Sequence, residues 1–276
     1  MKFAPLFLAA ALTWSTAAVA DEKEPINLGE DKFKLSAGGF FTDFSSSLRI
    51  DATEGDQSAD IDVEEDLGLN STTETFRLEG YWRVGPRHRI NAAWYKLNRN
   101  GVTEISTDIE WGDLTFPVGV TIDTGVDLSI IPISYSYSFF KRENWELAAS
   151  IGFHWIDIET FIQGEAFVDG QPVLSAQSRS SDVKGPFPLV GLVFDFQPAP
   201  KWQIGTSIQY LDISISKYNG RLLDAKFYVE YYIWRNVGVG LAYNYFDLNA
   251  GVTEDNFIGN VGSEYNGFMG YITSKF

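Results

Sequence analysis

The segment "SEYNGFMGYITSKF" (Ser263–Phe276) decides the fold of this chain. Taken two residues at a time, Phe268, Ile272 and Phe276 share one face, and the other face is also rich in aromatic residues. Neither face is clearly polar, as one face would be on a strand half exposed to water. The alternation predicts a β-strand, and the rest of the chain must show what covers its two apolar faces.

The same alternation recurs along the chain and predicts ten strands. They cover residues 32–50, 73–85, 88–103, 124–141, 144–160, 187–197, 201–217, 221–235, 237–249 and 263–276. The connections from even to odd strands are short, as in "VGPRH" and "WRNV", whereas most of the others are long or polar: 51–72, 104–123, 161–186 and 250–262. The exception is the hairpin "KYNGRL", in which Asn219-Gly220 suits a type I′ turn. Short turns at one end and long loops at the other predict an all-β, antiparallel up-and-down barrel of the transmembrane kind.

The two faces of each predicted strand differ in chemistry. In the fifth strand, Trp145, Ile151 and Trp155 share one face, and Glu146 and His154 lie on the other. In a secreted β-sandwich or a lipocalin-like fold, the charged face would meet water and the apolar face would form the core. In a membrane barrel, the charged face lines the lumen and the apolar face meets lipid.

The positions of the aromatic residues favour the membrane barrel. One group lies within a few residues of the short turns, on the apolar face of each strand, and a second group lies further along. Eight to ten residues separate Trp145 from Phe153 and Trp155, which corresponds to roughly 20–25 Å of depth at ~3.3 Å rise and ~40° tilt. The predicted membrane-interface aromatics are Trp82, Trp94, Phe139, Trp145, Trp155, Phe196, Trp202, Tyr210 and Tyr243.

The N-terminal stretch "MKFAPLFLAAALTWSTAAVA" predicts export from the cytoplasm. Lys2 is followed by an apolar run and by the small-x-small pattern Ala18-Val19-Ala20, so we expect a signal peptide over residues 1–20. A periplasmic segment over 21–31 and the barrel over 32–276 would follow. The zero Cys count excludes disulfides and thiolate metal sites, and the formal charge of −16 argues against nucleic acid as a partner.

The tail resembles the C-terminal signature of outer-membrane β-barrel proteins, in which a terminal Phe closes an alternating strand that the barrel assembly machinery recognises. Phe268, Ile272 and Phe276 match its apolar positions, and Ser274 departs from it because a large residue is frequent there. In architecture the chain resembles the small OmpA-like and OmpW-like barrels, without a motif of one functionally defined family. The resemblance implies the outer membrane, periplasmic termini, contact with outer-membrane lipid and lipopolysaccharide, and a monomer.

The inward positions of the predicted strands collect a set of charged residues. They could form a selectivity lining or a ligand site, but buried charges are tolerated only when paired, and side chains largely fill small barrels. We therefore expect a plugged lumen held by ion pairs. The predicted lumen polar network is Lys34, Arg77, Glu79, Arg83, Glu146, His154, Asp195, Lys226 and Glu230.

The sequence gives little support to catalysis. His154 and His88 are the only histidines, and His88 lies beside a short turn. The barrel esterases pair a Ser with a His, but Ser150 lies four strand residues from His154, roughly 13 Å away. The omptin proteases pair an Asp with a His, but Asp157 falls on the opposite face. We expect a non-enzymatic protein without cofactor, with a structural or surface-interaction role. A narrow channel for small solutes and a hydrolase acting on lipid or peptide are the alternatives.

Two long connections carry their own signals. The segment from Asp51 to Glu74 holds nine acids and no base, without EF-hand spacing, and we expect a solvated outer loop whose apolar residues fold back onto the barrel rim. In "TFIQGEAFVDGQPVLSAQS", Asp169-Gly170 predicts a hairpin above the bilayer rather than two further membrane strands, which would make twelve.

Overall fold

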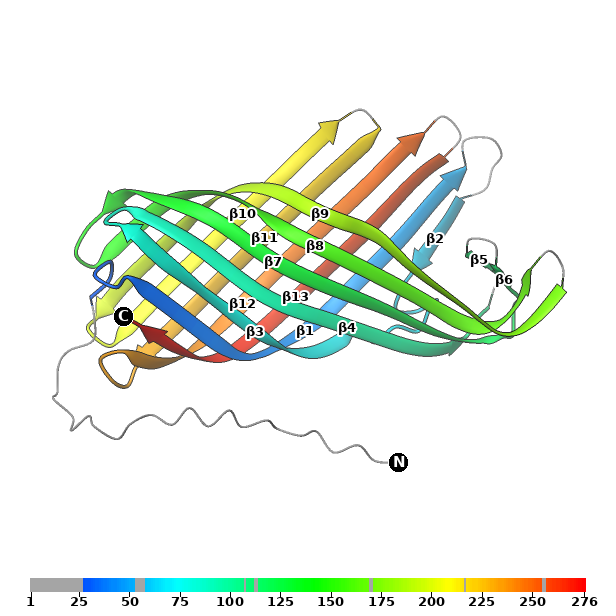
Figure 1. Ribbon diagram of the computed structural model, residues 1–276, viewed down its shortest axis with the longest axis horizontal. Coiled ribbons are helices and arrows are strands. Elements are labelled where there is room, and N and C mark those ends of the chain that lie inside the picture. The colour runs from blue at the N-terminus through cyan, green and yellow to red at the C-terminus, as the bar shows by residue number, and fades with distance from the viewer. Residues whose placement is uncertain are drawn as a thin grey trace.

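The computed structural model describes residues 27–52, 58–106, 108–111, 114–168, 171–215, 217–254 and 257–276, and every regular element in this part is a β-strand. Ten long antiparallel strands form one closed barrel (Figure 1). They are β1 (Phe33–Ala52), β3 (Thr72–Gly85), β4 (His88–Glu104), β7 (Thr121–Lys141), β8 (Trp145–Val168), β9 (Gln171–Ala199), β10 (Trp202–Ile215), β11 (Tyr218–Tyr232), β12 (Val237–Glu254) and β13 (Phe257–Lys275). The predicted ten-stranded antiparallel barrel is confirmed.

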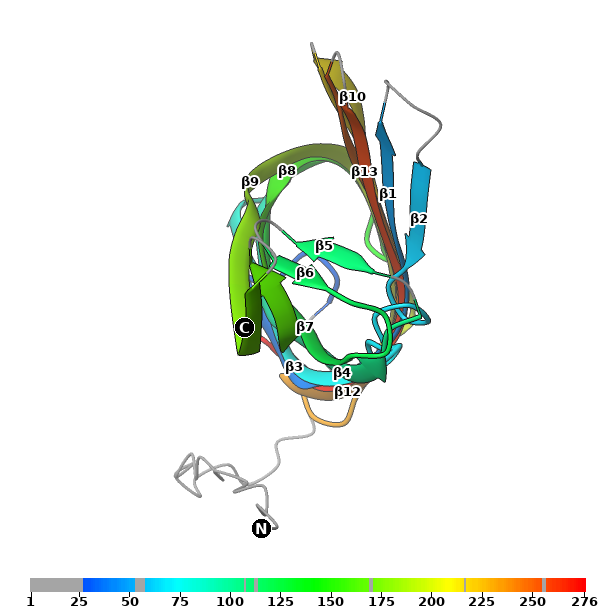
Figure 2. The ribbon, with the colours of Figure 1, turned by 90° about the vertical axis from the view of Figure 1, so that its right-hand side faces the viewer.

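The barrel closes between its first and last strands. β1 pairs with β13 from Lys34 opposite Lys275 to Ala52 opposite Phe257, along the full length of both strands. Three short strands lie off this ring. β2 (Ser58–Asp62) pairs with β1, and β5 (Ile109–Trp111) and β6 (Leu114–Phe116) form a hairpin across the mouth of the barrel (Figure 2).

The two ends of the barrel differ. At one end, called here the turn end, short connections join the strands, and Phe276 lies there beside β1 (Figure 1). At the opposite hairpin end the strands run on as paired hairpins: β8 and β9 stay paired up to Val168 and Gln171, and β12 and β13 up to Glu254 and Phe257. The prediction of long loops over 161–186 and 250–262 is therefore wrong, because most of these residues extend the strands. Asp169-Gly170 lies outside the described residues.

The predicted turn at Asn219-Gly220 is also wrong. Ile215 pairs with Tyr218, so the turn falls at residues 216–217, and Asn219 and Gly220 are strand residues of β11. A turn at Asn219-Gly220 would shift every pair between β10 and β11. The first residue of β10 would then lie opposite β12 and would have no partner on β11. The short turn after β11 thus helps to determine the register between β10 and β11, because this register must leave partners for the residues at both ends of the two strands.

The inside and outside of the wall have opposite chemistry. Side chains inside the barrel form one large apolar cluster in its hairpin-end half, around Phe40, Tyr95, Ile130 and Phe246. A second cluster fills the mouth, where Leu67 and the following turn fold inward against β4, β7 and β8. Large apolar side chains also cover the outer wall, where a water-soluble protein would expose polar residues.

The wall is complete at the turn end but splits toward the hairpin end. The β9–β10 ladder runs from Ala199–Trp202 only to Val190–Tyr210, and beyond this pair β9 stays with β8 and β10 stays with β11. Figures 1 and 2 show β10–β13 and β1 diverging there from β7–β9. From Val190 toward the hairpin end, β9 contains Pro188 and Pro186. Neither proline has the N–H group that a longer ladder would use. This split is called the β9–β10 seam below.

Candidate functional site

The predicted lumen residues meet inside the barrel in successive layers. Nearest the turn end, the Arg83 guanidinium donates to both carboxylate oxygens of Glu146, at 2.9 and 3.0 Å, and the Ser138 hydroxyl donates to the same carboxylate. Arg83 and Glu146 are both buried. A bidentate pair of this kind fixes the two side chains in one orientation and closes the lumen at this level.

The next layer joins strands from opposite sides of the barrel. Lys34 of β1 forms an ion pair with Glu230 of β11 at 2.6 Å. Glu79 of β3 accepts from Arg77 at 3.0 Å and also pairs with Lys226 of β11. The pairs that Lys34 and Lys226 form join strands that are not neighbours in the wall, so these two pairs cross the lumen.

A further ion pair involves a residue absent from the predicted set. Arg89 donates from Nη1 to Asp195 at 2.6 Å, and its guanidinium lies over the Tyr81 ring, 5.2 Å from the ring centroid. The alternation of Arg89 with Asn91 and Tyr95 on β4 could have identified it as an inward residue. Arg89 was left out of the predicted network because it lies beside the "GPRHR" turn, at the start of the strand.

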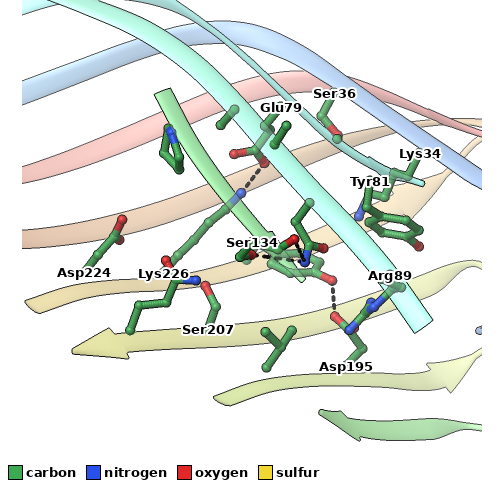
Figure 3. Close-up of a pocket in the computed structure, with 18 of the residues that line it drawn as sticks. Lys34, Ser36, Glu79, Tyr81, Arg89, Ser134, Asp195, Ser207, Asp224 and Lys226 are labelled. Carbon is green, nitrogen blue, oxygen red and sulfur yellow. Dashed lines mark hydrogen bonds and ion pairs between the residues drawn. The ribbon is translucent and has the colours of Figure 1, made fainter. Parts of the chain in front are cut away.

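These ion pairs surround a cavity of about 160 Å³ in the lumen (Figure 3). Its ionic lining balances formally, with four cations and four carboxylates: Lys34, Arg77, Arg89, Lys226, Glu79, Asp195, Asp224 and Glu230. Ala93 and Pro132 contribute apolar surface. The cavity is therefore lined by charges that balance formally, with apolar surface between them, and it is large enough for water or a small solute.

His154 lies at the edge of this region and is buried. Its Nε2 is 3.2 Å from Gln209 Oε1 and 3.4 Å from Asp224 Oδ2, and its ring stacks on Phe246. The Ser150 hydroxyl finds no hydrogen-bond partner among the described groups, so no Ser–His pair forms there. This arrangement holds the imidazole in place without presenting it to a substrate.

Two further residues of the sequence analysis lie away from the lumen. Asp157 points outward and accepts from Lys184 at 2.7 Å, and this hydrogen bond raises the pKa of the exposed Lys184. His88 lies beside Tyr135, with its Nδ1 2.6 Å from the hydroxyl. Among the described residues no group of three or more His, Cys, Asp or Glu could hold a metal ion.

The hairpin end of the lumen is closed by the segment after β2. Leu67 and Leu69 are buried in the mouth cluster, and Leu69 forms a bridge with Gly101 of β4. Arg99, inside the wall, pairs with Glu64 and donates to the Ser46 hydroxyl at 2.9 Å. The apolar residues of this acidic segment were expected to fold onto the rim of the barrel. In the structure, Leu67 and Leu69 insert into its mouth.

The turn end is closed by the residues that precede β1. Leu28 is buried, and its N–H donates to Gln197 Oε1 at 2.7 Å. Lys141 donates to the carbonyl oxygen of Gly29 at 3.1 Å. Asp31 is buried as well. The predicted signal peptide, residues 1–20, lies outside the described residues.

The outer wall carries the predicted girdle residues. Seven of the nine are exposed, and Trp145 and Phe196, which pair across β8 and β9, are half-buried. The exposed ones are Trp82, Trp94, Phe139, Trp155, Trp202, Tyr210 and Tyr243. Phe268, Ile272 and Phe276 lie on the same outer surface, 66%, 63% and 58% exposed. No helix in the described part is long and apolar enough to cross a bilayer.

A closed antiparallel barrel with an apolar outer wall and a charged, filled lumen can lie only in a membrane, because its outer face would be unstable in water. The chain is a transmembrane β-barrel. No family model and no curated protein matches the chain.

Three solved structures are similar in architecture. The outer membrane protease OmpT from Escherichia coli is 12% identical, over 88% of this chain and 97% of its own, with a TM-score of 0.49. The toluene transporter TodX from Pseudomonas putida is 11% identical, over 91% and 93%, with a TM-score of 0.40. The outer membrane protein OprG from Pseudomonas aeruginosa is 12% identical, over 89% and 96%, with a TM-score of 0.38.

Proposed function

We propose that this protein is a non-enzymatic, closed outer-membrane barrel that anchors an extended sheet at the cell surface. In this proposal the turn end lies in the periplasm and the hairpin end faces the outside, since short turns are periplasmic in bacterial outer-membrane barrels. The protein acts as a monomer, and its outer wall meets outer-membrane lipid and lipopolysaccharide.

Occlusion of the lumen at three levels carries the proposal. The residues before β1 fill the turn end, ion pairs cross the middle, and Leu67 and Leu69 fill the mouth. A solute channel would need a continuous water path along this axis. Ion pairs with buried members resist opening, because separating them leaves charges without partners.

The length of the strands supports the surface role. β8 continues from the girdle residue Trp155 to Val168, a path of roughly 40 Å at the standard rise. Asp62, Glu65 and Asp66 are exposed at this same end. An extended acidic surface of this kind suits contact with cationic groups on another surface.

Conductance separates this proposal from the channel alternative. Purified protein in planar bilayers should show no steady open state, while Arg99→Ala, which frees the mouth segment, should at most add brief openings. A steady, sizeable conductance of the unmodified protein would overturn the closed-barrel proposal.

The hydrolase alternative has its own test. Esterase and peptidase substrates should be turned over no faster by the protein than by its His154→Ala variant. A hydrolytic activity that disappears with this substitution would reverse the ranking in favour of an enzyme.

A further inference from the structure

The unpaired side of one buried arginine suggests a ligand. Arg89 is 2% exposed, and of its three guanidinium nitrogens only Nη1 has a partner. Nε and Nη2 find no acceptor among the described groups. These two nitrogens form one edge of the guanidinium, whose parallel N–H groups match the two oxygens of a carboxylate.

A buried, charged donor edge needs an acceptor. Leaving such donors without partners costs stability, because their water has been removed and nothing replaces it. Arg89 lines the lumen cavity beside Asp195, so an acceptor placed there would lie close to its guanidinium (Figure 3). Ala93 and Pro132 offer an apolar surface in the same cavity. Together they fit a small molecule with a carboxylate head and a compact apolar body.

The β9–β10 seam ends beside this cavity. Gln209 lines the cavity and pairs with Gly191, and the next pair, Val190–Tyr210, is the last of the ladder. Above it, Phe187 and Leu211 are only partly buried and pack against the apolar cluster of the lumen. The seam is thus separated from the cavity by two apolar side chains and the Gln209–His154 contact.

We infer that the lumen cavity is a binding site for a small monocarboxylate, held by the free edge of Arg89 and entered from the side through the β9–β10 seam. Entry by this route does not require the axis of the barrel to open. The site is therefore compatible with a lumen that is closed at both ends, and it adds a ligand to the proposed surface role.

The first part of the test concerns the ligand, with 4-fluorobenzoate as the probe and 4-fluorobenzamide as its neutral counterpart. Calorimetric titration of the refolded protein should show saturable binding of the acid and none of the amide. Arg89→Lys keeps a cation beside Asp195 but lacks the planar edge, and it should weaken binding by about tenfold or more. Absence of saturable binding, or equal binding by the lysine variant, would overturn the site.

The second part concerns the entrance and uses the absence of native cysteine. Pro188→Cys with Asp212→Cys places a thiol pair at the second register position beyond the ladder, the first at which both side chains are exposed. Crosslinking should slow exchange of the bound acid, followed by fluorine NMR, by about tenfold, and reversal should restore it. The matched control is Leu192→Cys with Ile208→Cys, a pair inside the ladder, which should leave exchange unchanged. Equal exchange in both crosslinked proteins would overturn the side entrance.

Discussion

At the scale of single residues, charges inside the lumen must be paired. Arg83 and Glu146 are both buried, and they form two hydrogen bonds. Such a pair contributes little net stability when intact, since removing both ions from water is costly, but the loss of one partner leaves an uncompensated charge. The pair therefore fixes the arrangement of the lumen more than it raises the stability of the barrel.

This asymmetry gives a prediction for Glu146→Ala. The substitution should lower the free energy of unfolding by about 3–5 kcal/mol, because Arg83 stays buried without its partner. Urea unfolding in detergent micelles, followed by the mobility of folded and unfolded protein on gels, measures the change. Lys184→Ala is the control: it removes an ion pair whose lysine is 59% exposed, so no measurable change is expected. A loss of equal size in both variants would contradict this account.

At the scale of elements, prolines decide where neighbouring strands separate. Pro186 and Pro188 lie on the part of β9 that has left β10, while its ladder to β8 continues through them. Pro132 has a similar local effect inside the wall, since the β4–β7 ladder skips the positions opposite Ile131 and Pro132. In both places, a proline without an N–H donor lies where the ladder is interrupted.

Restoring these donors should change the seam. In the double variant Pro186→Thr with Pro188→Thr, the ladder should extend, and amide exchange over residues 211–215 of β10 should slow. Pro132→Thr is the matched control, because it should slow exchange only around Ala93 and Trp94, far from the seam along the wall. Unchanged exchange over 211–215 in the double variant would show that the prolines do not hold the seam open.

The sequence predicted the elements within the membrane well and those beyond it poorly. Between the two girdles, each strand has lipid on one side and the lumen on the other, so alternation marks residues such as Trp145 and Glu146 clearly. Beyond the girdle this contrast disappears, although the backbone ladder continues, and residues 161–168 were therefore expected as loop. Arg89 and the inserted Leu67 depend on contacts between distant strands, which a pattern along one strand does not contain.

At the scale of the whole molecule, the first and last strands of the barrel are joined at the turn end. The Phe276 N–H donates to the Phe33 carbonyl at 2.8 Å, and the Phe276 carbonyl accepts from the N–H groups of Lys32 and Phe33. The final strand thereby closes the barrel against β1 while its large side chains lie on the outer wall. A signal read by the assembly machinery would be exposed on this strand before closure.

Deleting Phe276 should therefore affect delivery more than stability. Within a folded barrel, the change loses the burial of one Phe, roughly 1.5–3 kcal/mol, and the backbone hydrogen bonds of Phe276 at the end of the β1–β13 ladder, so the variant should still refold into detergent. In cells, however, the amount of inserted barrel should fall much further than this loss explains. Trp82→Ala is the control, since Trp82 stacks on Phe33 at the same interface, 6.0 Å between ring centroids, but lies outside the tail. It should lower stability without blocking insertion, and equal insertion of the deletion variant and the unmodified protein would remove the assembly role of the tail.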